Sequence, residues 1–498
     1  MTHNTSTADS RSMNRRLILA VMLAGAFVAI LNETLLNVAL PRIMHDFQVT
    51  ANTVQWLTTV YMLTNGVLIP VTAFLVQKVS TRALFITGMG LFAVGSLVAA
   101  IAPAFFVLVI ARVVQASGAA IVLPLLMNVI LAVYPMEQRG AAMGLVGLVI
   151  TFAPAIGPTL SGWLVDHYSW HLLFFIVLPI AIADLGFAYV ALPNVLTLTN
   201  PRIDMVSIAL STVGFGGLLY GFSDAGTAGW HSAAVLGSLA AAVAALALFL
   251  GRQLHLAVPM LEFRVFRVRA FTLSTIITIM VFMSMFSAML LLPLYLQNDR
   301  GFTPFSSGLL VMPGAIAMGI MSPIAGKIFD RIGGRWLGVV GSVLLAAALL
   351  RFTVVSNATS YLSLMGAFVF MMLGMSLIMM PVMTAGLNRL PPHLYPHGTA
   401  VSNTLQQVAG AVGTALLVTV MTDGAKSWMA SHDRRSPANP LSLASQASIH
   451  GMDRAFLVAA FFAVISLVLC FFVQKAPLPQ TGGKPGSDGS VGAQAVPE

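Results

Sequence analysis

The sequence predicts an all-α membrane protein with fourteen transmembrane helices, and three observations lead to this class. Of the 498 residues, 58% are hydrophobic and only 8% are charged, whereas about a quarter of a soluble globular chain is charged. The apolar residues form blocks of about 20 or more, the length that crosses ~30 Å of hydrocarbon. The lysines and arginines concentrate between alternate blocks, which is the positive-inside pattern. We therefore interpret the net charge of +9 as a topology signal and expect no nucleic-acid partner.

The expected spans follow one another with short connections along most of the chain. In order, they cover residues 17–40, 54–77, 83–102, 104–133, 140–165, 170–193, 204–224, 231–250, 270–296, 304–327, 336–355, 359–387, 398–422 and 453–474. The first block is too long for a signal-peptide core, and no small-residue cleavage site follows it. We interpret it as a transmembrane helix after a cytoplasmic segment, residues 1–16. The Gly-, Pro- and Ser-rich tail over 476–498 is predicted to be disordered.

An even number of spans places both termini on one side of the membrane. Most of the 25 lysines and arginines, including Arg264, Arg267 and Arg269, fall on the inner side when the termini are cytoplasmic. The loop over residues 426–452 then lies outside. This bias predicts a multi-pass protein of the bacterial inner membrane with both termini in the cytoplasm.

The sequence offers no chemistry for catalysis. A single cysteine, Cys470, excludes a disulfide framework and a cysteine metal site. The sequence contains no Walker phosphate loop, no His-rich metal cluster and no plausible hydrolase triad. We therefore expect neither an enzyme nor a cofactor, and we expect an ion gradient rather than ATP to supply energy.

A short motif occurs twice. Gly326-Lys-Ile-Phe-Asp330-Arg331-Ile-Gly333-Gly-Arg335 follows the tenth span, and a weaker copy that contains Gln77, Lys78, Ser80 and Arg82 follows the second. The copies are further apart than six spans with their loops require. The spacing therefore predicts a six-helix bundle over 17–193, two additional helices within 194–269, and a second six-helix bundle over 270–475. Duplicated bundles with a site between them are a transporter architecture.

Several motifs carry a family resemblance. The second copy resembles the loop motif of the major facilitator superfamily, and Arg112-Val-Val-Gln115-Ala-Ser-Gly118 resembles its fourth-helix motif. Ala153-Pro-Ala-Ile-Gly157-Pro158-Thr-Leu-Ser-Gly162 resembles the fifth-helix motif that marks antiporters. The segment Leu31–Pro41 is similar to the first-helix signature of the fourteen-span drug:proton antiporters, which include multidrug and lincomycin exporters. On these motifs, residues 17–475 are identified as a member of this family.

Two departures from the family pattern matter. Asn32 occupies the position where the family usually has an aspartate, and the carboxylate has moved to Glu33. One residue is a rotation of about 100° on a helix, so Glu33 need not make the same contacts. The first loop motif has Gln77 in place of its aspartate and Ser80 in place of its second glycine. We therefore expect a weaker salt-bridged contact at this loop in the first half of the chain.

Ionisable residues at membrane depth are candidates for function. Apolar surroundings favour a neutral carboxyl at Glu33, and a nearby cation favours the carboxylate, so Glu33 could exchange a proton as access alternates. The alternative is a structural pair in which Glu33 and Arg112 lock two helices together. The resemblance makes Arg112 a proton-relay or charge-partner residue; a structural arginine bound to carbonyl groups is the alternative. Asp184, in the sixth span, is either a second protonation or cation site or a buried neutral side chain.

Spacing along the helices indicates two further sets of residues. Polar side chains at helical spacing predict either a substrate cavity or interhelical hydrogen bonds: Asn37, Thr58, Tyr61, Asn65, Gln115, Asn403 and Gln407. The small residues Gly157 and Gly162, with the helix breaker Pro158, predict a closely packed, bending contact between the two halves.

The resemblance implies a proton-coupled antiporter that exports amphipathic, drug-like compounds from the cytoplasm by alternating access. The expected partners are such small molecules and membrane lipid, and a periplasmic adaptor is left open. One alternative is a dedicated lipid or metabolite exporter of the same fold. Another is a non-transporting signalling or scaffold protein, which the motifs retained in both halves argue against.

Overall fold

The computed structural model describes residues 14–196, 198–199, 204–256, 259–356, 358–432 and 440–473, and these form fourteen long helices and no strand. The helices are α1 (Arg15–Asp46), α2 (Ala51–Lys78), α3 (Thr81–Ala100), α4 (Phe105–Val133), α5 (Arg139–His167), α6 (His171–Ala191), α7 (Met205–Ala228), α8 (Ala233–His255), α9 (Arg269–Leu294), α10 (Pro304–Ile332), α11 (Gly334–Phe352), α12 (Tyr361–Leu387), α13 (Tyr395–His432) and α14 (Pro440–Cys470). Short helical turns lie between them: η1 (Met136–Gln138), η2 (Phe263–Arg267), η3 (Tyr295–Asp299) and η4 (Pro392–Leu394). The predicted fourteen-helix membrane fold is confirmed.

Length and composition allow thirteen of these helices to cross a membrane, and the described apolar stretch of α9, Arg269–Met285, is shorter. A helix satisfies its own backbone groups, which apolar surroundings require. Hydroxyl and carboxylate side chains cap several helix starts: Thr50, Ser80, Asp204 and Thr303 each accept a backbone N–H.

Several helices extend beyond the predicted spans. The helix α13 continues to His432 and α14 begins at Pro440, so most of the predicted outer loop over 426–452 is helical. The helix α1 likewise runs through Pro41 to Asp46. Hydropathy marks the part of a helix that suits lipid, whereas the helix itself ends where a cap or turn ends it.

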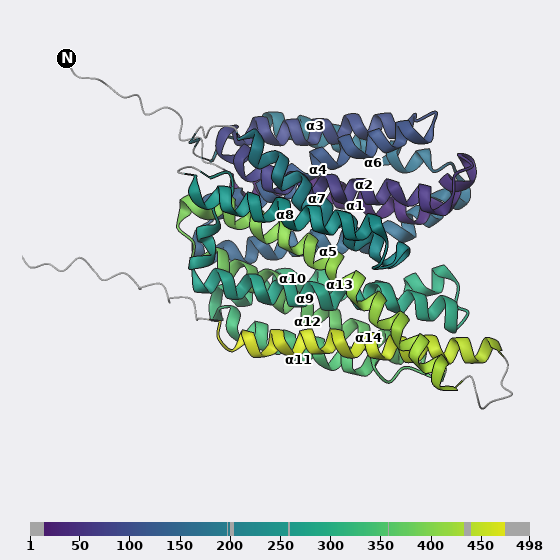
Figure 1. The fold of residues 1–498 in the computed structure, drawn as a ribbon. Coiled ribbons are helices and arrows are strands. Elements are labelled where there is room, and N and C mark those ends of the chain that lie inside the picture. Colours follow the sequence, from purple (N-terminus) through teal and green to yellow (C-terminus); the bar gives the residue numbers. More distant parts are fainter. Residues whose placement is uncertain are drawn as a thin grey trace, which may run out of the picture.

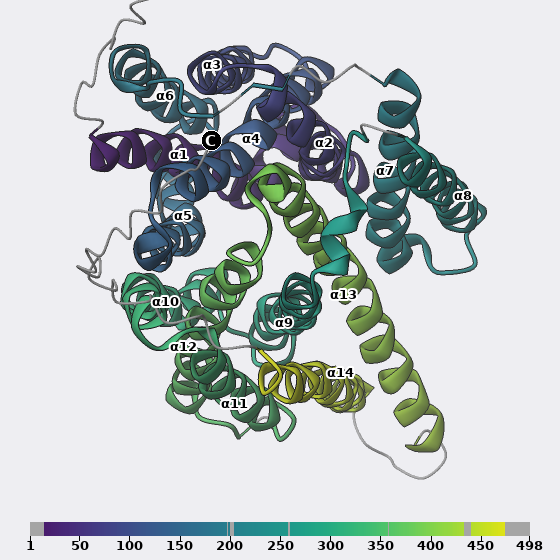
Figure 2. The ribbon, with the colours of Figure 1, turned by 90° about the vertical axis from the view of Figure 1, so that its left-hand side faces the viewer.

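The helices pack as two groups with an extra pair at one side (Figures 1 and 2). The first group is α1–α6 and the second is α9–α14. Two seams join the groups, one between α5 and α10 and the other between α13 and the helices α2 and α4. In the extra pair, α7 packs on α2 and α13 beside the second seam, and α8 packs on α7.

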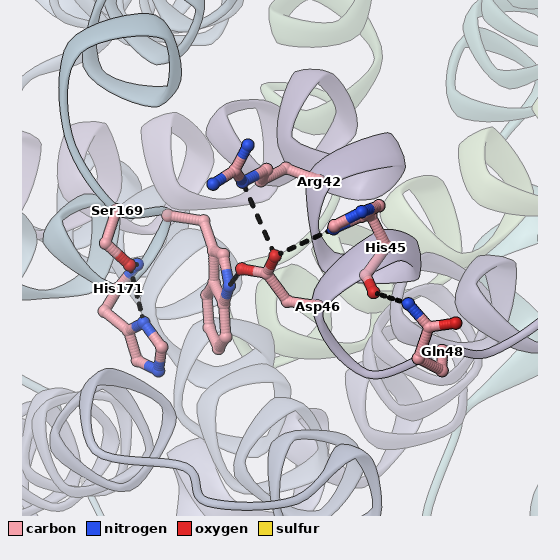
Figure 3. A network of polar contacts seen from close by, with 7 residues as sticks. Arg42, His45, Asp46, Gln48, Ser169 and His171 are labelled. Atoms are coloured by element: carbon pink, nitrogen blue, oxygen red, sulfur yellow. Dashed lines mark hydrogen bonds and ion pairs between the residues drawn. The ribbon is translucent and has the colours of Figure 1, made fainter.

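We call the end of the molecule at which α1 begins the Arg15 face. At the opposite face, Asp46 ties the end of α1 to α6, because the indole Nε1 of Trp170 donates to its Oδ2 at 3.1 Å. Arg42 and His45 approach the same carboxylate at 3.5 and 3.3 Å (Figure 3). Gln48, at a φ of 51°, then turns the chain into α2.

Candidate transport cavity

A cavity lies between the two groups. Helices α1, α2, α4 and α13 line it with Ala26, Ala29, Ile30, Glu33, Tyr61, Asn65, Ile69, Ala119, Ala120, Val122, Leu123, Pro124, Asn403 and Gln407. Its space for water-sized molecules is about 90 Å³, whereas pockets for drug-sized ligands measure about 300–1,000 Å³. The cavity is therefore too small for a drug-sized ligand in this arrangement.

The cavity brings together five of the residues singled out in the sequence. These are Glu33, Tyr61, Asn65, Asn403 and Gln407, from three helices and both groups. Thr58 and Gln115 are not among its lining residues. The side chain of Asn37 lies outside the described residues.

Adjacent residues of α1 face in different directions. Asn32 is 1% exposed and its Oδ1 accepts from Nη1 of Arg112 at 2.7 Å. Glu33 lines the cavity instead. The rotation of about 100° per residue explains why the amide and the acid have different surroundings.

Arg112 is fully buried in α4 and is held by neutral groups. Besides Asn32, it donates to Oε1 of Gln115 at 3.0 Å and to the carbonyl oxygen of Leu57 at 3.3 Å. Its guanidinium carbon lies 4.0 Å from the ring centroid of Tyr61, a cation–π contact. Gln115 in turn donates to Ser96 at 2.8 Å.

The predicted structural pair between Glu33 and Arg112 is not formed in this state. The ion pairs among the described residues do not include one between these side chains. Asn32 is the direct partner, and Nη2 of Arg112 is buried with no partner among the described residues. The guanidinium thus keeps one nitrogen free to donate to a further acceptor.

Asp184 lies in α6, outside the cavity lining. Its side chain is 4% exposed, and Oδ2 has no hydrogen-bond partner among the described residues. Gly25 of α1 makes room for it, because a Cβ at this glycine would lie 2.8 Å from Oδ2. The carboxyl is therefore enclosed between helices of the first group.

The prediction for the fifth-helix motif was wrong about the helix that it contacts. A Cβ at Gly157 would collide with Thr34 of α1, and Oγ of Ser161 donates to the carbonyl oxygen of Leu35 at 2.6 Å. Gly162 also faces α1, so the contact lies within the first group and not between halves. Small residues permit close approach without specifying the partner helix. The side chain of Pro158 lies outside the described residues.

Other glycines of α5 form the contact between the groups. A Cβ at Gly326 of α10 would collide with the carbonyl oxygen of Gly140, and one at Gly144 would lie 2.6 Å from the carbonyl oxygen of Ser322. The antiparallel backbones of α5 and α10 therefore approach closely near the Arg15 face.

The second copy of the loop motif closes this seam. The two carboxylate oxygens of Asp330 accept the N–H groups of Gly140 and Ala141, each at 2.8 Å. A carboxylate at the positive end of a helix dipole is favourable. Arg139 adds bonds to Oδ1 of Asn388 at 3.0 Å and to the hydroxyl of Tyr395 at 3.1 Å.

The other motif residues act locally. Gly333 has a φ of 81° and ends α10, a conformation that favours glycine. Arg331 is exposed. The guanidinium carbon of Arg335 lies 5.8 Å from the ring centroid of Trp336.

The weaker motif copy makes a neutral latch. The side-chain amide of Gln77 lies 3.2 Å from Nε2 of His397, at the start of α13. Deeper in the same seam, Nδ2 of Asn128 donates to Oγ1 of Thr399 at 2.8 Å. His397, Asn128 and Thr399 were not predicted from the sequence. One signal could have indicated His397: His397-Gly398 lies in the first turn of α13, as Arg139-Gly140 lies in the first turn of α5.

Comparisons with known proteins agree with this architecture. The sequence profile of the Major Facilitator Superfamily matches residues 22–414. The chain is 51% identical over 476 residues to an uncharacterized MFS-type transporter, YcnB, of Bacillus subtilis, covering 96% of this chain and 98% of that protein. It is 43% identical over 473 residues to the lincomycin resistance protein LmrB of the same species, covering 95% and 98%.

More distant matches extend the comparison. A multidrug resistance protein B homolog of Mycobacterium tuberculosis is 28% identical over 482 residues, covering 92% of this chain and 89% of that protein. The crystal structure of the human organic anion transporter MFSD10 (TETRAN) superposes with a TM-score of 0.65 at 14% identity, covering 92% of this chain and 99% of that one. At this identity the likeness concerns the fold alone.

Proposed function

Because the chain belongs to the major facilitator superfamily, whose members are multi-pass membrane transporters, we propose that it exports amphipathic, drug-like compounds from the cytoplasm in exchange for protons. One observation carries the proposal: a carboxylic acid, Glu33, lines the cavity between the two groups beside a buried arginine with which it forms no ion pair. The similarity to lincomycin and multidrug resistance proteins supports drugs as substrates.

The proton is carried by Glu33. A carboxyl group in the cavity takes up a proton when the cavity opens to one side and releases it when the cavity opens to the other. After release, the free Nη2 of Arg112 is a ready donor to the carboxylate. Tyr61 connects the cavity to Arg112, since it lines the cavity and its ring lies against the guanidinium of Arg112. Asp184 is the second candidate for the proton site.

Transport requires a second conformation. The cavity is too small for a drug in the described arrangement, and the Asp330, Arg139 and Gln77 contacts close the Arg15 face. Separating α5 from α10 at this face would enlarge the cavity and open it. We place the Arg15 face and both termini in the cytoplasm, so the described state is closed toward the cytoplasm.

Inverted membrane vesicles test the proposal. An imposed pH gradient, acid inside, should drive accumulation of a lincosamide or a lipophilic cation without ATP, and an uncoupler should abolish it. Accumulation that needs ATP or ignores the uncoupler would exclude proton exchange. A lysophospholipid is tested beside these compounds, because transport of the lipid alone would indicate a dedicated lipid exporter instead.

A further inference from the structure

The segments that flank the extra pair of helices both end on the Gln77–His397 latch. Thr199, before α7, donates its N–H to the carbonyl oxygen of Gln77 at 3.0 Å and its hydroxyl to Oε1 at 3.3 Å. Glu262, after α8, donates its N–H to Nδ1 of His397 at 3.2 Å. Gln77 ends α2 of the first group, and His397 begins α13 of the second. Each flanking segment thus holds one side of the latch.

The chemistry of the latch joins these contacts into one chain. A neutral imidazole has one donor and one acceptor nitrogen. Nδ1 of His397 accepts the N–H of Glu262, and Nε2 of the same ring lies 3.2 Å from Nε2 of Gln77. The same amide donates from Nε2 to the carbonyl oxygen of Ala73 at 3.0 Å and accepts the hydroxyl of Thr199 at Oε1.

A polar clamp joins the start of α7 to the end of α8. Nε and Nη2 of Arg252 donate to the two carboxylate oxygens of Asp204 at 2.8 and 3.1 Å. Gln253 donates to Oγ of Ser207 at 2.6 Å and accepts the N–H of Leu261 at 3.1 Å. Hydrogen bonds from Arg252 lower the pKa of Asp204 to about 2, so the pair remains ionised near neutral pH.

The pair α7–α8 also contacts both groups away from this clamp. Trp56 of α2 stacks on Tyr220 of α7 with ring centroids 6.0 Å apart. Beyond α7, Nε1 of Trp230 donates to Oγ1 of Thr419 of α13 at 2.5 Å. The pair therefore lies across the second seam and is attached to each side of it (Figure 2).

We propose that α7 and α8 act as a strap that holds α2 and α13 together and stabilises the closed state of the Arg15 face. The clamp fixes the spacing of the flanking segments, and those segments fix Gln77 against His397. Opening the Arg15 face separates α2 from α13, which breaks the latch. Contacts present only in the closed state shift the equilibrium toward it, and their removal shifts it back.

Distance measurements between spin labels test the strap without substrate or a proton gradient, so the result does not depend on the proposed function. Labels are attached to Ala83→Cys in α3 and Lys327→Cys in α10, on a Cys470→Ser background in lipid nanodiscs. Both positions are exposed and lie near the Arg15 face, one in each group. Double electron–electron resonance then gives the ratio of separated to close label pairs.

Two variants weaken the clamp at different residues and leave Gln77 and His397 intact. Asp204→Asn weakens the bond to Arg252, and Gln253→Leu removes the bonds to Ser207 and Leu261. Each should raise the ratio of open to closed molecules by roughly two- to tenfold, the effect of losing one or two hydrogen bonds. The exchange Asp204→Arg with Arg252→Asp restores the ion pair but not the cap that Asp204 gives to Ser207, so it should bring the ratio part of the way back toward the wild-type value.

Asp46→Asn is the matched control, because it alters an acidic residue in an ion pair at the opposite face. It should leave the ratio unchanged. A monodisperse gel-filtration profile establishes that each variant is folded. Wild-type distance distributions in both folded clamp variants, including the case in which only the closed distance is populated throughout, would overturn the proposal.

Discussion

Asn32 and Glu33 are neighbours on α1 but have different surroundings. Asn32 binds Arg112 through a neutral carbonyl oxygen at 2.7 Å. Glu33 lines the cavity instead. A carboxylate at Asn32 would pair permanently with the guanidinium and would be difficult to protonate. The amide holds the arginine in place without neutralising it, which keeps Glu33 and Arg112 available to each other.

Replacing Glu33 with glutamine should separate coupling from binding. Glu33→Gln keeps the shape of the side chain and removes the titratable proton, so gradient-driven export should be abolished while substrate still binds to the purified protein. Glu33→Asp should retain partial activity, since the acid remains with a shorter reach. Efflux in vesicles and equilibrium binding in detergent are measured side by side. Wild-type efflux by Glu33→Gln would remove this residue from the coupling mechanism.

Asp184→Asn is the companion experiment for the other buried acid. Asp184 does not line the cavity and is enclosed beside Gly25, so we expect Asp184→Asn to keep gradient-driven export. Gly25→Ser should lower the melting temperature, because a Cβ would crowd Oδ2 and the helices of the first group. Loss of export in Asp184→Asn with unchanged substrate binding would identify Asp184 as the proton site instead of Glu33.

Some of the polar residues at helical spacing line the cavity, whereas the partner of Arg112 was not predicted. Helical spacing selected Tyr61, Asn65, Asn403 and Gln407, because residues on one helix face share an environment. It could not select Asn32 as the partner of Arg112, since an amide beside an acid gives no sign of which one turns toward α4. Contacts across the seams were missed for a related reason. Asn128 and Thr399 are far apart in sequence, and only packing brings them together.

At the scale of helices, glycine positions decide how the two groups meet. Gly140, Gly144 and Gly326 leave no room for a Cβ between α5 and α10. The carboxylate of Asp330 then caps the start of α5. Close backbone approach and the cap act at the same face, so the first seam closes as a unit. The Gln77–His397 latch closes the second seam with neutral groups.

Gly144→Ala should destabilise the closed seam. Its Cβ would meet the backbone of α10 at 2.6 Å, and overpacking of this kind costs about 1–3 kcal/mol. The melting temperature of the purified protein should fall. Gly186→Ala in α6 is the control, because a Cβ there has nothing within 4 Å and alanine favours a helix. A melting temperature for Gly144→Ala as high as that of Gly186→Ala would contradict the close contact.

Over the whole molecule, hydropathy and the repeated motif were sufficient to predict the fourteen helices and the membrane fold. They were not sufficient for helix ends beyond the lipid, as the extensions of α13 and α14 show. Hydropathy also does not indicate which helices contact one another across the seams. The fifth-helix motif illustrates this, since its small residues pack on α1 and leave α10 to other glycines.

The orientation of the molecule in the membrane is the last prediction. We expect Arg267, in η2 on the Arg15 face, to lie in the cytoplasm, because basic residues are retained there. Met429, near the far end of α13 and 47% exposed, should lie outside. In intact bacterial cells carrying the Cys470→Ser background, an impermeant thiol reagent should label Met429→Cys at once. It should label Arg267→Cys only after the membrane is permeabilised. The reverse pattern would place the closed Arg15 face outside the cell. Opening of the other face would then expose Glu33 to the cytoplasm.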